Sequence, residues 1–223
     1  TNSIGKEKAG ILRNNQKLIF GAKKIPESVV KMIDSLNVDL HKIDNQNLEE
    51  DLHINKNAVK IATKAIELID PKISEKNIFN SIRNTKILGR CDLINNEFLV
   101  DVAHNKDAIK NLKSFIKSRS LDEDGIAAIF HCSKSKNPIS LISPLNKLFS
   151  ELRIPRINNF RLLDEEYIEE SFNNHFEIKV SIDETIEKSI KEIKLLKPES
   201  LILIFGSFYL AGEFYKLPFI KNV

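Results

Sequence analysis

Apolar residues recur in two different rhythms along this 223-residue chain, and the rhythm changes near residue 88. Before that point the pattern is mostly helical. The clearest case is the stretch 55–69, NKNAVKIATKAIELI, whose apolar residues fall on one stripe of a helix that Pro71 ends. The residues of this stripe are Ala58, Ile61, Ala62, Ala65, Ile66 and Ile69.

Shorter elements are predicted around this helix. Pro26 occupies the favoured first position of a helix with the sequence PESVVKMIDSL. The polar stretch 45–54 reads as a loop. The other elements predicted in this part are a helix ending at Gly10, strands at 18–21 and 39–43, and a helix at 75–85.

From about residue 88, strand-like apolar runs alternate with helical patterns. Such alternation predicts βα units and a mainly parallel sheet covered on both faces, which is an α/β fold. We expect a domain boundary between about residues 72 and 88, which gives domains 1–80 and 81–223. The predicted strands are 98–100, 125–131, 152–154, 176–180 and 201–205, and the helices begin at 105, 138, 164, 183 and 206.

Composition and charge narrow the class of protein. Hydrophobic residues make up 42% of the chain, enough for a core, and the net charge is only +3. Lys and Glu alternate as on solvated helix faces, so no nucleic-acid partner is expected. The longest apolar run, 201–212, is too short for a membrane span. Cys91 and Cys132 form no CxxC pair, which favours a reducing, cytoplasmic location over a disulfide framework.

The stretch 97–112, EFLVDVAHNKDAIKNL, carries polar chemistry where a strand gives way to a helix. Asp101 ends the strand, and ligands of open parallel sheets bind at the carboxyl ends of strands. Asn105 suits a helix N-cap, and a helix start suits phosphate. Asp101 could bond ribose or Mg²⁺-bound water, and His104 a phosphate or base. This pattern alone leaves a nucleotide site and a locally satisfied, capped turn equally open.

Three further motifs accompany this one, in a fixed order. They are KEKAGI at 6–11, GR at 89–90 and IFGSFYLAGE at 204–213. Together with DVAHN, they resemble the folylpolyglutamate synthase/dihydrofolate synthase family of Mur-type ligases, and the resemblance covers essentially the whole chain. It implies that residues 1–80 are the end of a Mur-ligase ATPase domain. Residues 81–223 would then be the smaller, Rossmann-like C-terminal domain.

The resemblance also implies a reaction. Family members use ATP and Mg²⁺ to convert a carboxylate of folate or dihydropteroate into an acyl phosphate. The amine of L-glutamate then attacks this intermediate, and an amide forms. The implied partners are these small molecules, and family members are typically monomers.

Two implied site motifs lie in the first part of the chain. Lys8 matches the catalytic lysine that is carbamylated in the family, and a carbamate can help to hold Mg²⁺; the alternative is an ordinary helix-end lysine. His53 and Asn57 match the spacing of an HQxxN segment whose Asn faces adenine, although Ile54 replaces the Gln. The alternative for Asn57 is a helix cap.

Further implied ATP-binding residues follow the domain boundary. Arg90 matches an arginine that reaches ATP phosphate, a task that suits its planar, permanently charged fork. The alternative is a surface arginine after a turn. Asp101 and His104 match residues that contact the nucleotide, and Asn105 follows them. Lys106 stands where the family usually has Pro.

The loops after the predicted strands 125–131 and 201–205 also correspond to family motifs. The first departs from its motif and the second matches it. The family carries a DKD segment where this chain has Ser135, Lys136 and Asn137, so only the lysine is retained. Lys136 could contact phosphate or glutamate, or be a solvated loop lysine. Gly206 and Ser207 match a GS turn. Ser207 could bind a ligand, but helix capping is the favoured interpretation.

The phosphate-loop motif GxxGxGK[ST] does not occur in this sequence. We therefore expect the chain to be part of a longer ligase and to show weak or no ligase activity alone. One alternative is another Mur-type ligase acting on a cell-wall nucleotide precursor, which the KEKAGI and GSFYLAGE pair disfavours. Another is a non-catalytic nucleotide-binding module, which the lost DKD carboxylates favour.

Overall fold

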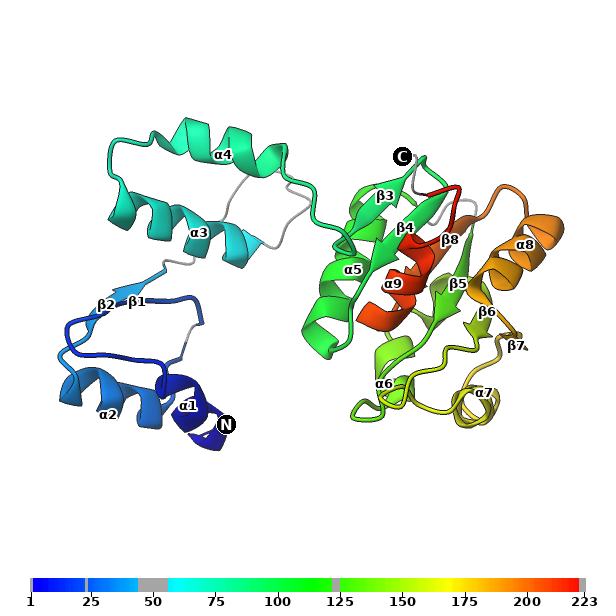
Figure 1. The fold of residues 1–223 in the computed structure, drawn as a ribbon, viewed down its shortest axis with the longest axis horizontal. Coiled ribbons are helices and arrows are strands. Elements are labelled where there is room, and N and C mark those ends of the chain that lie inside the picture. The colour runs from blue at the N-terminus through cyan, green and yellow to red at the C-terminus, as the bar shows by residue number, and fades with distance from the viewer. Residues whose placement is uncertain (1, 23, 44–55, 122–124, 221–223) are drawn as a thin grey trace. The chain divides into compact units, whose positions relative to one another are not determined.

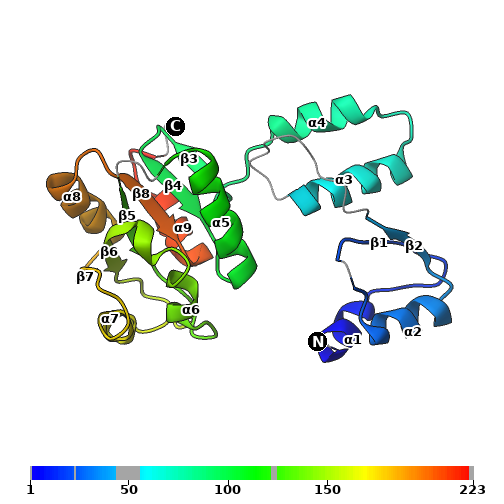
Figure 2. The ribbon, with the colours of Figure 1, turned by 180° about the vertical axis from the view of Figure 1, so that it is seen from behind.

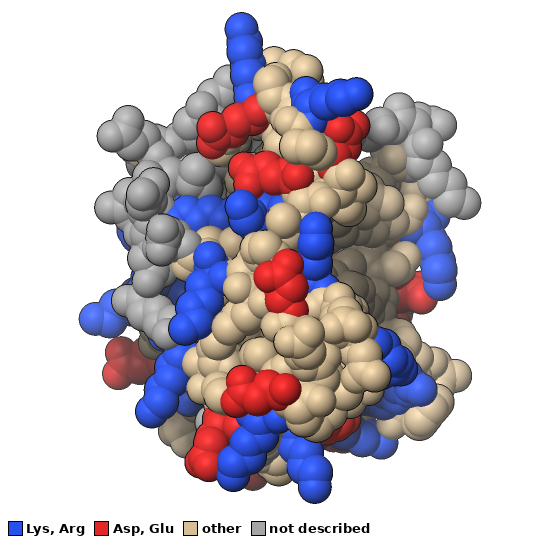
Figure 3. Space-filling model, turned by 90° about the vertical axis from the view of Figure 1, so that its left-hand side faces the viewer, with Lys and Arg blue, Asp and Glu red and all other residues tan. Residues whose placement is uncertain are grey.

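The computed structural model describes residues 2–22, 24–43, 56–121 and 125–220. The chain divides into two compact units, residues 1–85 and 86–223, each with its own apolar core. Within the described residues, no helix has both the length and the apolar character needed to cross a membrane. On the face shown in Figure 3, Lys and Arg side chains are interspersed with Asp and Glu, as the alternating sequence predicts.

The described part of residues 1–85 consists of helices around a small parallel sheet (Figure 1). The helix predicted to end at Gly10 and the strand predicted at 39–43 are confirmed within a residue. The predicted loop at 45–54 lies outside the described residues. The elements are α1 (Asn2–Ala9), β1 (Lys17–Phe20), α2 (Glu27–Ser35), β2 (Asp39–Lys42), α3 (Lys56–Ile69) and α4 (Glu75–Arg83).

The core of this unit joins α1, α2 and the two strands. Val29 and Ile33, one turn apart on α2, are buried together with Ala9 of α1. Pro26 is the N-cap of α2, one position earlier than predicted, with the φ of −59° that its ring favours. The sequence pattern therefore located this helix to within one residue.

The apolar stripe predicted on α3 is not the face that the structure buries. Val59 and Thr63 are the buried residues of this helix, whereas Ala58 and Ala62 are exposed and Ile69 is 83% exposed. The helix contacts β1 and α4 rather than a broad sheet. Burial is therefore confined to the turn that meets these small elements.

Residues 86–223 form an α/β unit around a six-stranded sheet with the order β3-β4-β8-β5-β6-β7 (Figures 1 and 2). All neighbouring pairs are parallel except β3 and β4. The predicted mainly parallel sheet is thus confirmed. The strands are β3 (Asp92–Ile94), β4 (Phe98–Asp101), β5 (Ile126–Phe130), β6 (Phe149–Pro155), β7 (Val180–Asp183) and β8 (Leu201–Phe205).

Helices cover both faces of this sheet. Apolar residues of α5, α6 and α7 form one core cluster with alternate strand residues such as Ala128 and Phe130. Residues of α8 and α9 form a second cluster with the intervening residues, such as Ala127 and Ile129. Successive side chains of β5 point to opposite faces of the sheet, so this strand contributes to both core clusters. The helices are α5 (Lys106–Ser118), α6 (Pro138–Ile142), α7 (Glu165–Asn173), α8 (Ile186–Leu196) and α9 (Phe208–Tyr215).

Three predicted elements of this unit differ from the structure, namely the helix at 138–150 and the strands at 152–154 and 176–180. The helix expected at 138–150 stops at Ile142, and β6 begins at Phe149 after one 3₁₀ turn. The strand expected at 176–180 begins only at Val180, because Phe176 and Ile178 pack on the core beneath α7 rather than joining a ladder. Apolar alternation here reflects packing of a loop, not strand pairing.

The hairpin of β3 and β4 was not predicted. Its connection is Asn95-Asn96, with φ values of 52° and 56°, and the Glu97 N–H donates to the Ile94 carbonyl. Both central residues thus have the positive φ of a type I′ turn, which asparagine tolerates. The two adjacent asparagines were the available signal.

A buried charge network lies where β6 and β7 meet α8. Arg153 donates to both oxygens of the Asp183 carboxylate at 2.8 Å, and the Ser189 hydroxyl donates to the same carboxylate at 2.7 Å. Glu151, also buried, lies 3.6 Å from the Arg153 Nε. Charges this deep are tolerated only when paired, so the network depends on each partner.

Candidate functional site

The carboxyl ends of β4 and β8 form a topological switch point. These strands are parallel neighbours, with Asp101 opposite Phe205. The chain nevertheless leaves β4 into α5 on one face and leaves β8 into α9 on the other. Ligands of open α/β sheets bind at such points. We call this edge, with the loops that follow the two strands, the switch-point edge.

The loop that carries Arg90 is fixed to this edge by its backbone. Gly89 has a φ of +68°, and an added Cβ would lie 3.0 Å from the Val102 side chain. The Gly89 carbonyl accepts from the Val102 N–H at 2.9 Å, and its N–H donates to the Tyr215 hydroxyl at 2.7 Å. That hydroxyl in turn donates to Asp92 at 2.6 Å. Burial and the bond to Asp92 raise the pKa of Tyr215, so the hydroxyl keeps its proton.

Asp101 fastens the same loop from the other side. Its buried carboxylate accepts the Cys91 N–H at 2.8 Å and the Cys91 thiol at 3.3 Å. Cys91 has a φ of +45°, a conformation that is uncommon without glycine. Burial raises the pKa of Asp101, and the bonds from Cys91 only partly offset this effect. Asp101 therefore supports the Arg90 loop, and its contact with ATP stays a prediction.

Arg90 and His104 meet at one aromatic ring. The Arg90 guanidinium lies over Phe208, with its Cζ 5.7 Å from the ring centre. The His104 ring centre lies 5.8 Å from the same centre, at an interplanar angle of 46°. Arg90 precedes β3, His104 follows β4 and Phe208 follows β8, so three separate segments converge here. Two of the predicted ATP-binding residues thus contact the same aromatic ring.

The hydrogen bonds of His104 and Asn105 define what they can offer a ligand. The His104 Nδ1 lies 2.8 Å from the Val102 carbonyl, which can only accept, so Nδ1 carries a proton and Nε2 is the remaining nitrogen. Asn105 caps α5 by accepting the Ala108 N–H at 2.9 Å. The predicted N-cap is confirmed, and the role of Asn105 in ATP binding stays a prediction.

Gly206 and Ser207 form the turn into α9. Gly206 has a φ of +108°, and an added Cβ would lie 2.5 Å from the His131 carbonyl oxygen. Ser207 is buried and caps α9 by accepting the Leu210 N–H at 3.1 Å. The favoured interpretation of Ser207 as a cap is confirmed. Its hydroxyl proton is not used in this bond, which keeps ligand binding as a prediction.

Lys136 lies in the loop after β5, the counterpart of the DKD segment. Its side chain is half-buried, and its N–H donates to the Ser133 carbonyl. Asn137, where the family has a carboxylate, caps α6 by accepting the Ser140 N–H at 3.1 Å. The loop is also joined to the one after β6, because the Lys134 N–H donates to the Arg161 carbonyl. Lys136 stays a predicted contact for phosphate or glutamate.

Lys8 and Asn57 belong to the other unit, residues 1–85. Lys8 is exposed in the last turn of α1. Asn57 lies in the first turn of α3, and its amide donates to the Gly21 carbonyl at the end of β1, at 2.9 Å. The Asn57 amide therefore bonds a backbone carbonyl of the protein in this structure. Its contact with adenine stays a prediction. His53 lies outside the described residues.

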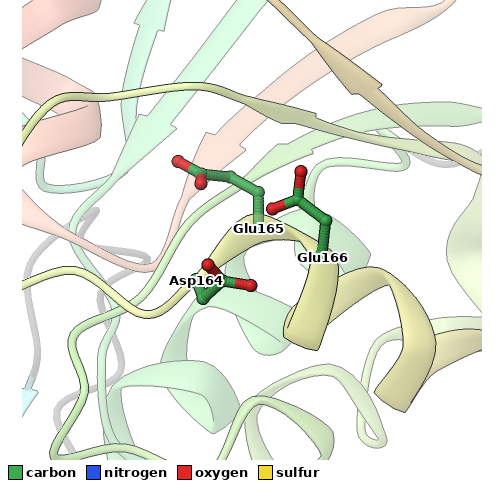
Figure 4. Close-up of side chains that lie close together, drawn as sticks. All are labelled: Asp164, Glu165 and Glu166. Carbon is green, nitrogen blue, oxygen red and sulfur yellow. The ribbon is translucent and has the colours of Figure 1, made fainter.

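Three adjacent carboxylates at the start of α7 come close to one another (Figure 4). Asp164 caps the helix by accepting the Tyr167 N–H. Arg156 pairs with Glu166 and lies 3.8 Å from Glu165. The hydrogen bond from Arg156 holds the pKa of Glu166 below its usual value. A helix start and an arginine thus balance these charges within the chain.

His131 was not predicted, because it belongs to no motif. It is fully buried after β5, and its Nε2 lies 3.0 Å from Glu165. Within the described residues, its Nδ1 has no hydrogen-bond partner. Burial tends to raise the pKa of Glu165, but the bonds from His131 and the Ile157 N–H lower it overall. This pair joins the loop after β5 to the first residue of α7.

Sequence reasoning missed Phe208, which begins α9 at the switch-point edge, and Tyr215, which bonds the Gly89 N–H from the end of α9. Phe208 directly follows the GS turn and precedes Tyr209 and Leu210. Leu210 is buried, but Tyr209 is only half-buried and accepts from Arg161 at 3.2 Å. The signal for Phe208 was its place at the start of a helix that follows a buried strand.

Comparisons with known proteins agree with this architecture. The family model for the dihydrofolate synthetase C-terminal domain matches residues 90–217. A dihydrofolate synthase/folylpolyglutamate synthase from Buchnera aphidicola subsp. Acyrthosiphon pisum is 30% identical over 242 residues, which cover 96% of this chain and 57% of that protein.

Solved structures share the fold. E. coli FolC in complex with DHPP and ADP has a TM-score of 0.81 at 18% identity, over 100% of this chain and 57% of that one. The bifunctional folylpolyglutamate synthase/dihydrofolate synthase from Yersinia pestis, complexed with AMPPNP and Mn ion, has a TM-score of 0.79 at 17% identity, over 96% and 56%. The chain thus spans a little over half the length of these relatives. Because the matched family domain accounts for more than half of the chain, the chain belongs to the folylpolyglutamate synthase/dihydrofolate synthase family.

Proposed function

We propose that this chain supplies the C-terminal part of an ATP-dependent ligase that joins L-glutamate to a carboxylate of folate or dihydropteroate through an acyl phosphate. The observation that carries the proposal is the convergence of Arg90 and His104 on Phe208 at the switch-point edge of a chain from this family. In this proposal residues 1–80 end the ATPase domain and residues 81–223 form the C-terminal domain.

The side chains at the edge suit the phosphates of ATP. The Arg90 guanidinium presents donors in a planar fork and stays charged at any relevant pH, so it can bind two phosphate oxygens. The His104 Nδ1 is occupied by the Val102 carbonyl, so Nε2 is the nitrogen that can bond a phosphate when protonated. Asn105 and Ser207 keep their proposed supporting roles in the loops after β4 and β8, and Lys136 keeps its proposed role in the loop after β5.

Mg²⁺ fits the described residues less well than ATP does. The Asp101 carboxylate is buried and already bonded to Cys91. Lys8 is exposed, and as an ammonium it repels a cation. A carbamate on Lys8 would supply an oxygen ligand, which is its proposed catalytic role. In that case Mg²⁺ would neutralise phosphate charge, while Asn57 would face adenine.

Glutamate-dependent ATP hydrolysis tests this function. In the protein that contains this chain, dihydropteroate or tetrahydrofolate together with glutamate should stimulate ADP release. Arg90→Ala should lower kcat/KM for ATP on the order of 100-fold, as expected when a donor to developing charge is removed. Arg119→Ala is the matched control, because Arg119 also stacks on a phenylalanine, Phe115, but lies at the end of α5.

The same assay separates the alternatives. Activity with a UDP-linked cell-wall precursor in place of the pterin would indicate another Mur-type ligase. Nucleotide binding without turnover would indicate a non-catalytic module. The 223-residue chain by itself should show weak or no turnover, and an in-frame GKS-type loop is expected in the coding DNA upstream of Thr1. We also propose a cytoplasmic monomer, which light scattering and cell fractionation can check.

A further inference from the structure

Phe208 is an apolar side chain in an unusual position. It is 61% exposed, although the neighbouring Ser207, Leu210 and Ala211 are all buried. The Ser207 cap fixes where α9 begins and so fixes the backbone of Phe208. Because most of the Phe208 ring remains in solvent, burial contributes little to its stability. The ring is therefore available for contacts with polar side chains.

The ring makes contacts with two polar side chains from distant segments. Arg90 lies over it at 5.7 Å, and the His104 ring lies 5.8 Å away. The guanidinium and the imidazole are thus no farther apart than the sum of these distances. The π-face of an aromatic ring attracts a guanidinium electrostatically. Phe208 therefore limits how far the long Arg90 side chain can move from His104.

The backbone alone does not supply this restraint. Tyr215 and Asp101 accept hydrogen bonds from the loop and Val102 donates one to it, but these bonds involve only the Gly89 backbone and Cys91. The Arg90 side chain has several rotatable bonds beyond this point. Loss of its rotamer freedom on ligand binding opposes affinity, and a contact that restricts it beforehand reduces that cost.

We propose that Phe208 is a positioning residue, whose ring holds the Arg90 guanidinium beside the His104 imidazole so that both address one phosphate group of a nucleotide. This inference rests on the proposed function, in which these two side chains bind ATP. Its central claim is that an exposed aromatic ring of α9, which never enters the reaction, organises the two phosphate-binding groups.

A ligand-free measurement tests the restraint itself. Nitrogen-15 relaxation at the Nε of each arginine reports side-chain mobility in the 223-residue chain. Phe208→Leu should raise the mobility of Arg90 and leave Arg161 unchanged. Phe160→Leu is the matched control, because Phe160 is 79% exposed and Arg161 lies 5.5 Å from its ring centre. It should leave Arg90 unchanged, whereas Arg161 keeps its bond to the Tyr209 hydroxyl and should be loosened less than Arg90 is by Phe208→Leu. Equal Arg90 mobility in wild type and Phe208→Leu would overturn the inference.

A binding measurement tests the consequence. The wild-type 223-residue chain and its variants are titrated with MgADP. Amide chemical shifts follow the titration, because they detect weak binding. Because a cation–π contact at an exposed site is modest, Phe208→Leu should raise Kd about 2- to 5-fold. Phe208→Tyr should restore it to within about twofold, since an aromatic ring returns. Phe160→Leu should bind like wild type.

The outcomes separate two failures. Wild-type affinity in Phe208→Leu, together with weakened binding in Arg90→Ala, overturns the positioning role and leaves the proposed function standing. A wild-type chain and a parent protein that both bind no nucleotide overturn the proposed function. The arginine relaxation data then still decide whether Phe208 restrains Arg90.

Discussion

Replacement of Asp101 separates a structural role from direct contact with a ligand. The carboxylate is buried and accepts the Cys91 N–H at 2.8 Å, which holds the loop of Arg90. Asp101→Ala removes that acceptor. Asp101→Asn keeps one acceptor oxygen of the same shape and removes the charge. The two variants therefore differ mainly in whether the loop keeps its anchor.

The magnitude follows from the stranded donor. A buried N–H without a partner costs about 1–3 kcal/mol, so Asp101→Ala should lower the unfolding free energy of residues 86–223 by about that amount. The left-handed Cys91 also loses the bond that offsets its strain. Asp101→Asn should cost about 1 kcal/mol or less, because its oxygen can still accept the Cys91 N–H. The Ala103 N–H also donates to the Asp101 carboxylate. In Asp101→Asn, this N–H would share the remaining side-chain oxygen with Cys91 or lose its acceptor.

Amide hydrogen exchange in β4, for example at Leu99, measures these differences for this unit alone. The pH dependence adds a second test. Burial raises the pKa of Asp101 above its ordinary value of 3.8, so the folded chain binds this proton more strongly than the unfolded chain. The unfolding free energy should therefore fall as pH rises from 3.8 through the folded pKa. Asp101→Asn should remove that part of the slope.

Equal stability of Asp101→Ala and Asp101→Asn would refute the anchoring role. A further comparison uses MgADP. If Asp101 acts through the loop, Asp101→Asn should keep most of the affinity for MgADP. Asp101→Ala should lose this affinity, because the loop no longer holds Arg90 in place. Loss of affinity in Asp101→Asn, at unchanged stability, would instead show that the charge itself contacts the nucleotide.

Three other substitutions test the packing of residues 86–223. Asp183→Ala leaves the Arg153 guanidinium buried without its two-oxygen partner and should cost about 3–5 kcal/mol in urea unfolding, whereas a cost below 1 kcal/mol would mean that water replaces the carboxylate. Gly206→Ala places a Cβ 2.5 Å from a backbone carbonyl at a φ of +108° and should cost at least about 2 kcal/mol; an unchanged Tm would contradict that close approach. Tyr215→Phe removes the acceptor of the Gly89 N–H and should speed exchange of that amide on the order of tenfold. Unchanged exchange would show that the loop does not need the hydroxyl.

Local sequence signals predicted much of this site. Asn105 and Ser207 are N-caps, as their residue types and their places after strands indicate. Gly206 has the positive φ that close packing of its turn requires. These features depend on a few neighbouring residues, because caps and turns are made by local hydrogen bonds. Sequence reasoning is reliable for such features.

Contacts between distant segments could not be read from the sequence. The partners of Asp101 and of the Arg90 side chain, Cys91 and Phe208, lie 10 and 118 positions away, and neither pairing has a sequence period. Apolar residues surround Phe208 in the sequence, and this local pattern does not indicate that its ring is exposed. Its exposure follows from which face of α9 packs on the sheet, which is a property of the whole fold.

The sequence by itself determined the family, the alternation of strands and helices after residue 88, and the chemical character of the residues at the strand ends. Tertiary structure alone decided that β8 inserts between β4 and β5, and so brings Phe208 beside Arg90 and His104. It also decided that the Asp101 carboxylate bonds Cys91 and so holds the loop that carries Arg90. The physical reason is that periodicity and capping encode local free energy, whereas strand order and the pairing of buried polar groups depend on the packing of the whole unit.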